Sequence, residues 1–230
     1  MNILILGRGK TGSMVAEVAR QRRHNIQVVG TSENTGGAAL TPEKVRGIDV
    51  IIDFTTPSSV LSHIEACVRA GKNMVVGTTG WHEELDRIRK LVESHGTGFI
   101  YGANFSIGVN IFLQAARSAA AALKYEYNGQ IFERHHAHKK DAPSGTAIAL
   151  QQVMRAAVGD VKKEDLEIIS FREGEVVGMH EVVLESAADR IYLCHDAKSR
   201  QGFAEGAELA AEWIAGKKGF YDFKDVWQEL

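Results

Sequence analysis

Cysteine and proline are both scarce in this sequence of 230 residues, which has two cysteines and three prolines. Cys67 and Cys194 lie far apart and show no metal-ligand spacing, so a disulfide framework and a cysteine-based metal site are both excluded. We therefore expect free thiols in a reducing compartment. The few prolines and the lack of a low-complexity run argue against long disordered linkers.

Long apolar runs and an excess of charge are also missing. No stretch approaches the roughly 20 apolar residues of a membrane span, and the run at residues 3–6 is too short for a secretion signal before it meets Gly7. The net charge of −2 provides no basic field for nucleic acid or an anionic membrane. We expect a cytoplasmic protein that binds neither.

The composition is that of an ordinary globular protein, with 44% apolar and 24% charged residues. Its length predicts two unequal lobes. Short apolar runs alternate with helical patterns over residues 1–106, and this alternation predicts a Rossmann-type α/β fold, a doubly wound parallel sheet. Strands are expected at residues 2–6, 26–31, 47–54, 72–76 and 98–101, and helices at 13–22, 58–70 and 81–95.

A glycine-rich turn, Gly7-Arg8-Gly9-Lys10-Thr11-Gly12, lies between the first strand and the first helix. This context makes the GxGxxG pattern a dinucleotide fingerprint, in which the glycines permit a tight turn and a close approach to pyrophosphate. Glu33 follows the second strand at about the distance where an acidic residue binds the ribose hydroxyls. The simpler alternative is a glycine-rich turn beside an exposed glutamate, which the order of strand, turn, helix, strand and acid disfavours.

Three further segments follow strands of the same predicted sheet: residues 55–57, 77–80 and 102–105. Ligands of such sheets bind beyond the carboxyl ends of the strands, so we expect these segments to border one crevice with the glycine-rich turn. Considered alone, Gly77-Thr78-Thr79-Gly80 is better explained as an ordinary turn between a strand and a helix.

The pattern changes after residue 106. An Ala-rich helix at 108–124 precedes strands at 125–135, 166–172, 178–186 and 189–196, with a helix at 145–157 between the first two. The alternation of polarity predicts a mostly antiparallel sheet. A helix at 200–216 and packing residues within 220–230 are expected to return to the first lobe. The predicted domains are residues 1–106 with 200–230 for dinucleotide binding, and 107–199 for substrate binding and oligomerisation.

Residues 133–147 carry the most distinctive chemistry of the chain. Three of its nine histidines and two lysines lie within residues 135–140, and Ser144-Gly145-Thr146 then opens a helix. Histidine and lysine can supply protons, and a helix N-terminus favours an anion. A solvated basic loop and a histidine metal site are the alternatives, although adjacent histidines on a strand cannot easily bind one ion.

These residues match a known signature. The segment 133–147 follows the pattern E-x-H-H-x-x-K-x-D-A-P-S-G-T-A, and the glycine-rich turn, residues 77–80, 103–110 and 195–204 add further matches. The sequence therefore resembles the dihydrodipicolinate reductase family of the diaminopimelate route to lysine, over the whole chain. The resemblance implies NAD(P)H-dependent reduction of a small cyclic dicarboxylate and a homotetramer assembled through the antiparallel sheets.

The resemblance also implies roles for individual residues. His135 would be the acid/base histidine and Lys139 the proton donor, while His136, Lys139, Gly145 and Thr146 would bind the substrate carboxylates. No metal is implied. The residues implied for the nicotinamide cofactor are Gly7, Arg8, Gly9, Lys10, Thr11, Gly12, Glu33, Gly77, Thr78, Thr79, Gly102, Ala103, Asn104 and Phe105.

The sequence departs from the family pattern after Glu33. Asn34 stands where many relatives carry arginine, no lysine or arginine occurs from residue 32 to 43, and the loop over residues 32–46 is short. Arginine there would bind the 2′-phosphate of NADPH, so we expect a preference for NADH or dual use of NADH and NADPH. An aspartate- or homoserine-type dehydrogenase and a non-catalytic dinucleotide sensor are the alternative functions.

Overall fold

The computed structural model describes residues 1–159 and 166–230. Within them the chain forms two compact units, one of Met1–Ile107 with Arg200–Leu230 and the other of Gly108–Ser199. We refer to them as the first unit and the second unit and describe each by itself.

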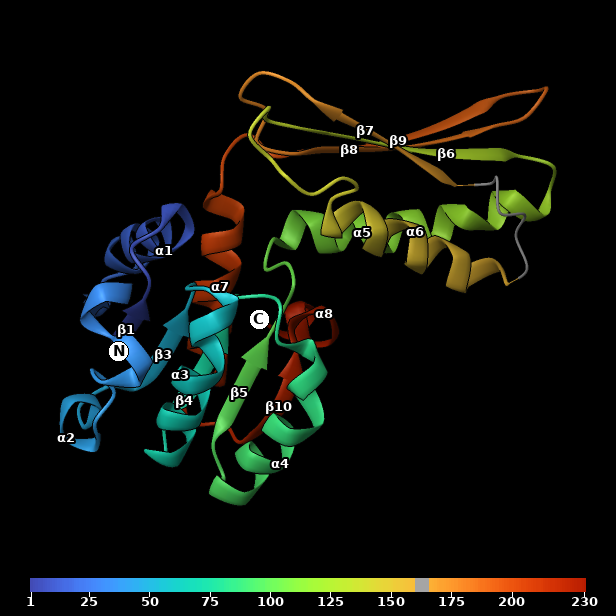
Figure 1. Ribbon diagram of the computed structural model, residues 1–230. Helices are drawn as coiled ribbons and strands as arrows, with labels where there is room; N and C mark the ends of the chain where they lie inside the picture. Colours follow the sequence, from blue (N-terminus) through green and yellow to red (C-terminus); the bar gives the residue numbers. More distant parts are fainter. Residues whose placement is uncertain (160–165) are drawn as a thin grey trace. The chain divides into compact units, whose positions relative to one another are not determined.

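The first unit contains a six-stranded sheet in the order β10-β5-β4-β3-β1-β2, and every pair of neighbours is parallel (Figure 1). The strands β1, β3, β4 and β5 are apolar and buried because helices cover both faces of the sheet. This confirms the doubly wound fold. The strands are β1 (Asn2–Leu6), β2 (Asn25–Val29), β3 (Val50–Asp53), β4 (Asn73–Val76), β5 (Gly98–Tyr101) and β10 (Gly219–Asp222).

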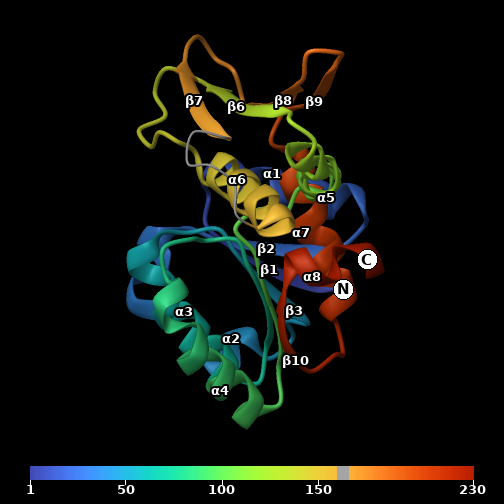
Figure 2. The same cartoon turned by 90° about the vertical axis from the view of Figure 1, so that its right-hand side faces the viewer.

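Two layers of helices cover this sheet. Helices α1 (Lys10–Gln21) and α7 (Gln201–Ile214) pack on one face, where Ile3 and Ile5 contact Val15 and the alanines of α7. Helices α3 (Pro57–Arg69) and α4 (Leu85–His95) pack on the other face with Leu4 and Leu6 (Figure 2). The short helices of the unit are α2 (Pro42–Val45), α8 (Phe223–Val226), η1 (Thr31–Glu33), η2 (Thr35–Gly37), η3 (His82–Glu84) and η5 (Trp227–Glu229).

The sixth strand was not expected from the sequence. Residues 220–230 were predicted only to pack on the first lobe, but β10 adds to the edge of the sheet by pairing with β5. Gly219 and Asp222 flank only two apolar residues, so the segment lacks the continuous apolar run that marked β3 and β4, and pairing with the edge of β5 selects its conformation.

The second unit contains a four-stranded sheet in the order β7-β6-β8-β9. Its strands are β6 (Asn128–His135), β7 (Glu167–Arg172), β8 (Met179–Glu185) and β9 (Arg190–Asp196). The pairs β6–β8 and β8–β9 are antiparallel, whereas β6–β7 is parallel. The expectation of a mostly antiparallel sheet is therefore met, with one parallel pair.

One face of the second sheet packs on helices α5 (Ile107–Ala119) and α6 (Gly145–Val158), which lie side by side along it (Figure 1 and Figure 2). Ile131, Val182 and Leu184 are completely buried against these helices. The helix expected at 108–124 ends earlier, at Ala119, and continues as the 3₁₀ turn η4 (Ala120–Lys124). Among the helices of residues 1–159 and 166–230, none has the length and apolarity needed to span a membrane.

Candidate functional site

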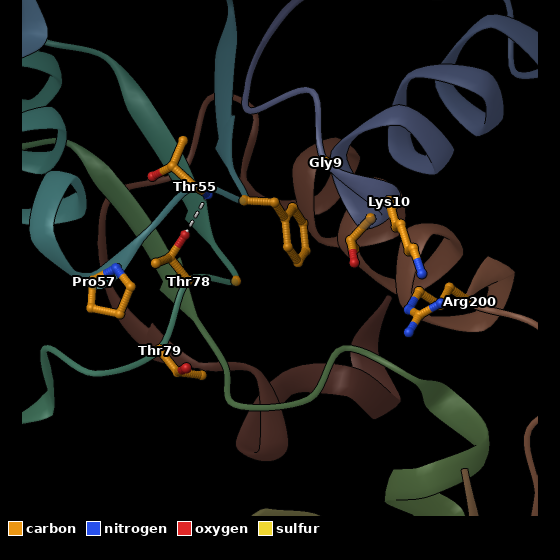
Figure 3. Close-up of a pocket in the computed structure, with 10 residues that line it drawn as sticks. Gly9, Lys10, Thr55, Pro57, Thr78, Thr79 and Arg200 are labelled. Carbon is orange, nitrogen blue, oxygen red and sulfur yellow. Dashed lines mark hydrogen bonds between the residues drawn. The ribbon is translucent and has the colours of Figure 1, made fainter. Parts of the chain in front are cut away.

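A cavity of about 360 Å³ lies in the first unit, where the strands β1, β3 and β4 end. Lys10 and Arg200 lie together on one side of it, and Pro57, Thr78 and Thr79 lie on the opposite side (Figure 3). The cavity thus combines two cations with hydroxyl groups and the first turn of α1. Its lining residues are Gly9, Lys10, Thr11, Phe54, Thr55, Pro57, Gly77, Thr78, Thr79 and Arg200.

The glycine-rich turn that opens α1 depends on its glycines for steric reasons. Gly7 has a φ of 107°, and a Cβ there would lie 2.2 Å from the carbonyl oxygen of Phe54. A Cβ at Gly12 would lie 2.2 Å from the carbonyl oxygen of Gly7, whereas one at Gly9 would meet nothing within 4 Å. Gly7 and Gly12 therefore close the turn, and Gly9 leaves the N-terminus of α1 open to a ligand.

A buried carboxylate fixes the loops on the other side of the cavity. Asp53 Oδ1 accepts hydrogen bonds from the backbone N of Thr55 at 3.0 Å and from the hydroxyls of Thr55 and Thr78, each at 2.7 Å. The His63 Nδ1 lies 2.7 Å from Asp53 Oδ2. The sequence reasoning missed Asp53 and His63, although an aspartate that ends a buried strand was a usable signal.

Aromatic packing determines where the remaining strand ends lie. A Cβ at Gly77 would lie 2.1 Å from the ring of Phe54, and that ring meets Phe105 edge-on with 6.1 Å between centroids. A Cβ at Gly102 would lie 2.9 Å from the Cβ of Phe223. Both glycines are thus required by close packing at the end of the sheet.

The structure brings together six of the expected cofactor residues as lining of this cavity: Gly9, Lys10, Thr11, Gly77, Thr78 and Thr79. Among the described residues, the lining does not include Gly7, Arg8, Gly12, Glu33, Gly102, Ala103, Asn104 or Phe105. Phe105 is instead buried, and Asn104 accepts a hydrogen bond from the backbone N of Ser106. Arg200, which the sequence offered only as a family match, lines the cavity.

Arg8 and Glu33 form an ion pair of 2.9 Å, and both side chains are about half exposed. Glu33 Oε2 also accepts a hydrogen bond of 2.8 Å from the backbone N of Gly30, at the end of β2. A cation therefore does lie beside Glu33, but it comes from the glycine-rich turn rather than from the loop after β2.

The second unit holds a buried polar cluster on strand β6. Glu133 and His135 point to the same buried face because side chains alternate along a strand. The Glu133 carboxylate is hydrogen-bonded to His135 Nδ1, to Arg172 at 2.7 Å and to the backbone N of Ser144 at 3.3 Å. Burial alone would raise the pKa of Glu133, but the hydrogen bonds from Arg172 and Ser170 and the charge of His135 hold that pKa below its ordinary value.

His135 keeps 8% of its surface exposed. Burial lowers the pKa of His135, and the neighbouring Glu133 only partly opposes this effect. The neutral imidazole is therefore the main form at pH 7. The Nε2 atom lies toward Gly178, where an added Cβ would be 3.0 Å away.

The start of α6 is tied to the same cluster. Ser144 caps the helix by accepting a hydrogen bond of 3.2 Å from the backbone N of Ala147, and its hydroxyl lies 3.1 Å from His180 Nε2. Burial, together with the charge of His135, lowers the pKa of His180 to about 4, so His180 is neutral and can accept from Ser144. Gly145 and Thr146 are the first two residues of α6, and they are exposed and half-buried respectively.

The loop after β6 carries the remaining candidates. Lys139 Nζ lies 2.8 Å from a carboxylate oxygen of Asp141, and Arg172 donates a hydrogen bond to the Asp141 carbonyl. His136 and Lys139 are half-buried, whereas His138 and Lys140 are exposed. A freely solvated loop would leave all of these groups exposed, so the arrangement favours a site.

Two groups of side chains in the described part of the chain lie close enough to hold a metal: Glu133, His135 and His180 in the second unit, and His24, Glu208 and Glu212 in the first. In the second unit Glu133 already has three hydrogen-bond donors, and the cationic Arg172 is one of them. We therefore interpret that cluster as a hydrogen-bond network.

Both halves of the chain match family models. Residues 1–105 match the model described as the N-terminus of dihydrodipicolinate reductase, and residues 108–227 match the model of its C-terminus. A 4-hydroxy-tetrahydrodipicolinate reductase of Christiangramia forsetii is 36% identical over 240 residues, covering 100% of this chain and 99% of that protein. The enzyme of the same name from Neisseria meningitidis serogroup A is 38% identical over 77% of this chain and 72% of its own length.

Solved structures extend the similarity. Dipicolinate-bound dihydrodipicolinate reductase from Paenisporosarcina sp. TG-14 superimposes with a TM-score of 0.78 and 25% identity, over 98% of this chain and 99% of that one. An amine dehydrogenase from Mycobacterium smegmatis has a TM-score of 0.63 at 10% identity, over 97% and 95% of the two chains, and shares the fold alone.

Proposed function

The chain belongs to the dihydrodipicolinate reductase family, and from that premise we propose how its residues carry out the NAD(P)H-dependent reduction of 4-hydroxy-tetrahydrodipicolinate in lysine and diaminopimelate biosynthesis. One observation carries the assignment of the substrate site: a buried acid–imidazole pair, Lys139 and the N-terminus of α6 all lie on one short stretch of the second unit.

The first unit would hold the cofactor. The open turn at Gly9 and the first backbone N–H groups of α1 suit a pyrophosphate, and Lys10 and Arg200 add positive charge at the same cavity. Thr78 and Thr79 would contact the cofactor from the opposite side. When bound, the reduced nicotinamide supplies the hydride, and every other task falls to the chain's own residues.

The second unit would bind the two carboxylates of the substrate. Gly145 and Thr146 present the N-terminal end of α6, where backbone N–H groups and the helix dipole favour an anion. His136 and Lys139 add donors from the preceding loop. Neutralising both carboxylates makes the ring more ready to accept hydride.

Reduction of the ring requires a proton beside the carbon that receives the hydride, and His135 and Lys139 would transfer it. Lys139 donates it from its ammonium group, and His135 acts as the acid/base group through Nε2, since its Nδ1 is hydrogen-bonded to Glu133. The dicarboxylate-bound relative and the family match support this assignment over a homoserine- or aspartate-type dehydrogenase.

For the cofactor, we infer NADH preference or dual use. Glu33 would repel a 2′-phosphate, and the adjacent cation, Arg8, is already paired with Glu33. The measurement is kcat/KM with NADH and NADPH at equal ionic strength. Glu33→Gln is expected to improve NADPH use several-fold relative to NADH; a strong NADPH preference of the unmodified enzyme would contradict the inference.

For assembly and location, we propose a homotetramer in the cytoplasm that associates with neither nucleic acid nor membrane. The sheet face opposite α5 and α6 carries exposed Phe171 and Tyr192, which suits contact with a second copy. Light scattering of the purified protein measures the mass, and a monomer at micromolar concentration would contradict the tetramer.

The experiment for the activity is oxidation of NADH or NADPH when substrate is generated by the preceding synthase. Turnover is expected only with that substrate present. A dinucleotide sensor would bind the cofactor without turnover, and a different dehydrogenase would respond to an amino acid and not to the cyclic dicarboxylate.

A further inference from the structure

We propose that Glu133 positions His135 for proton transfer and that Arg172 extends the same hydrogen-bond network to the loop that carries Lys139. The inference rests on the proposed function, in which His135 and Lys139 handle the proton. Neither Glu133 nor Arg172 has a role in that function so far.

The contact with Glu133 fixes the tautomer of His135. A carboxylate can only accept a hydrogen bond, so the contact between Glu133 and His135 Nδ1 requires the proton of the neutral ring to be on Nδ1. Nε2 is then the atom that remains to exchange a proton. It lies toward Gly178, the residue whose missing side chain leaves space beside it.

Glu133 also fixes the orientation of the His135 ring. Glu133 and His135 are two residues apart on β6, so the strand itself places them side by side on the buried face. The carboxylate cannot turn away, because its other oxygen is held by Arg172 at 2.7 Å and by the backbone N of Ser144 at 3.3 Å. The imidazole is thus attached to a carboxylate that is itself fixed.

Glu133 also increases the proton affinity of His135. Burial lowers the pKa of His135, and the negative charge of Glu133 is the largest opposing influence. Without that charge the imidazole would take up a proton only at lower pH. Glu133 therefore sets both which nitrogen reacts and how readily it does so.

Arg172 links this pair to the loop. It lies opposite His135 in the register between β6 and β7, and it donates to both Glu133 and the carbonyl of Asp141. The side chain of Asp141 in turn holds Lys139 at 2.8 Å. A single guanidinium therefore connects the strand that carries His135 with the loop that carries Lys139.

The test is a double-mutant cycle with E133Q, H135Q and the double variant, in which kcat is measured across pH with a coupled substrate supply. E133Q is expected to lose on the order of 10-fold or more in kcat, with the pKa of the His135 limb moved to lower pH. If Glu133 acts through His135, the double variant loses no more than H135Q alone. E185Q, which removes an exposed carboxylate from β8 of the same sheet, is the matched control and should keep full activity.

A ¹⁵N spectrum of the histidine side chains gives a second readout, which is measured first on the unmodified enzyme. The proposal expects the neutral His135 ring to carry its proton on Nδ1, and to lose this preference in E133Q. A proton on Nε2 in the unmodified enzyme would overturn the proposal. An E133Q enzyme with normal kcat and an unchanged pH profile would also overturn the proposal. If H135Q were inactive at the same time, the proposed function would still stand. Near-normal turnover in H135Q would overturn the proposed function and this inference together.

Discussion

Each unit of the molecule buries a carboxylate against an imidazole, and the two pairs differ in what surrounds them. In the first unit, Asp53 and His63 are 0% and 1% exposed. In the second unit, His135 keeps 8% exposure beside Gly178. The two carboxylates also have different donors, since Asp53 holds the hydroxyls of Thr55 and Thr78 whereas Glu133 holds Arg172.

The difference teaches how one chemical pair serves two purposes. The His63 Nε2 is buried without a hydrogen-bond partner among the described residues, and the Nδ1 atom of the same ring holds Asp53. The Asp53 network shapes the loops that line the cavity. The Glu133 network instead leaves one nitrogen of its histidine able to meet a ligand, which is what proton transfer requires.

The largest effect is expected when His135 or Lys139, the two proposed proton-transfer residues of the second unit, is replaced. H135Q and K139A should each lose on the order of 100-fold or more in kcat, because proton delivery is removed. Binding of NADH, measured by fluorescence titration, should survive in both, since the cofactor residues belong to the other unit. H63Q, the matched change in the first unit, should retain kcat in the fraction that folds. Near-normal turnover in H135Q or K139A would show that the roles were assigned wrongly.

The second-largest effect is expected when the Asp53–His63 pair of the first unit is broken. D53A leaves the donors of Thr55, Thr78 and His63 without an acceptor, so the free energy of unfolding should fall by on the order of 3 kcal/mol. Urea unfolding measures it, and D86A, which removes an exposed carboxylate from α4, should change it little. Unchanged stability in D53A would mean that water replaces the lost acceptor and that the pair is not structural.

These two pairs also mark the limit of sequence-based prediction here. The glycine-rich turn was predictable because its constraint is local: strand, turn and helix follow one another, and the glycines sit where a Cβ would collide. The helix start at Ser144-Gly145-Thr146 was predictable for the same reason. The parallel sheet followed from the alternation of short apolar runs with helices.

The partners of the buried groups were not predictable. Arg172 and His180 meet Glu133 only because β7 and β8 pair with β6 in a particular register, and a shift of one residue would turn them to the other face. Arg200 enters the cavity from the far end of the chain. Such contacts depend on tertiary pairing, which single-sequence patterns do not encode.

A moderate effect is expected when a methyl group is added at Gly178, beside His135. G178A would add a Cβ at 3.0 Å from Nε2, and the imidazole cannot turn away while Glu133 holds its other nitrogen. We expect kcat to fall several-fold with little change in thermal stability. G47A in the first unit adds a methyl group into open space and is the control. Equal activity of G178A and the unmodified enzyme would show that Nε2 does not need this space.

The smallest effect concerns a third carboxylate, Glu208 on α7, which is completely buried like Glu133 but lacks its donors. Both of its oxygens are without a hydrogen bond in the described part of the chain, although His24 Nε2 lies 3.1 Å from Oε1. Burial and the neighbouring Glu212 raise the pKa of Glu208 to about 7, against the opposing charges of Arg22 and the N-terminal amine. The comparison with Glu133 shows that donors, more than burial, decide the direction of the shift.

This shift makes the stability of the first unit depend on pH. Because the pKa of Glu208 is higher in the folded chain than in the unfolded one, its stabilising contribution is full below the unfolded pKa of about 4.3 and is lost as the pH rises through about 7. E208Q cannot ionise, so its urea midpoint should fall less than that of the unmodified protein between pH 5 and pH 8. E93Q, an exposed change on α4, should follow the unmodified protein. Identical pH profiles for E208Q and the unmodified protein would show that Glu208 does not cause the pH dependence.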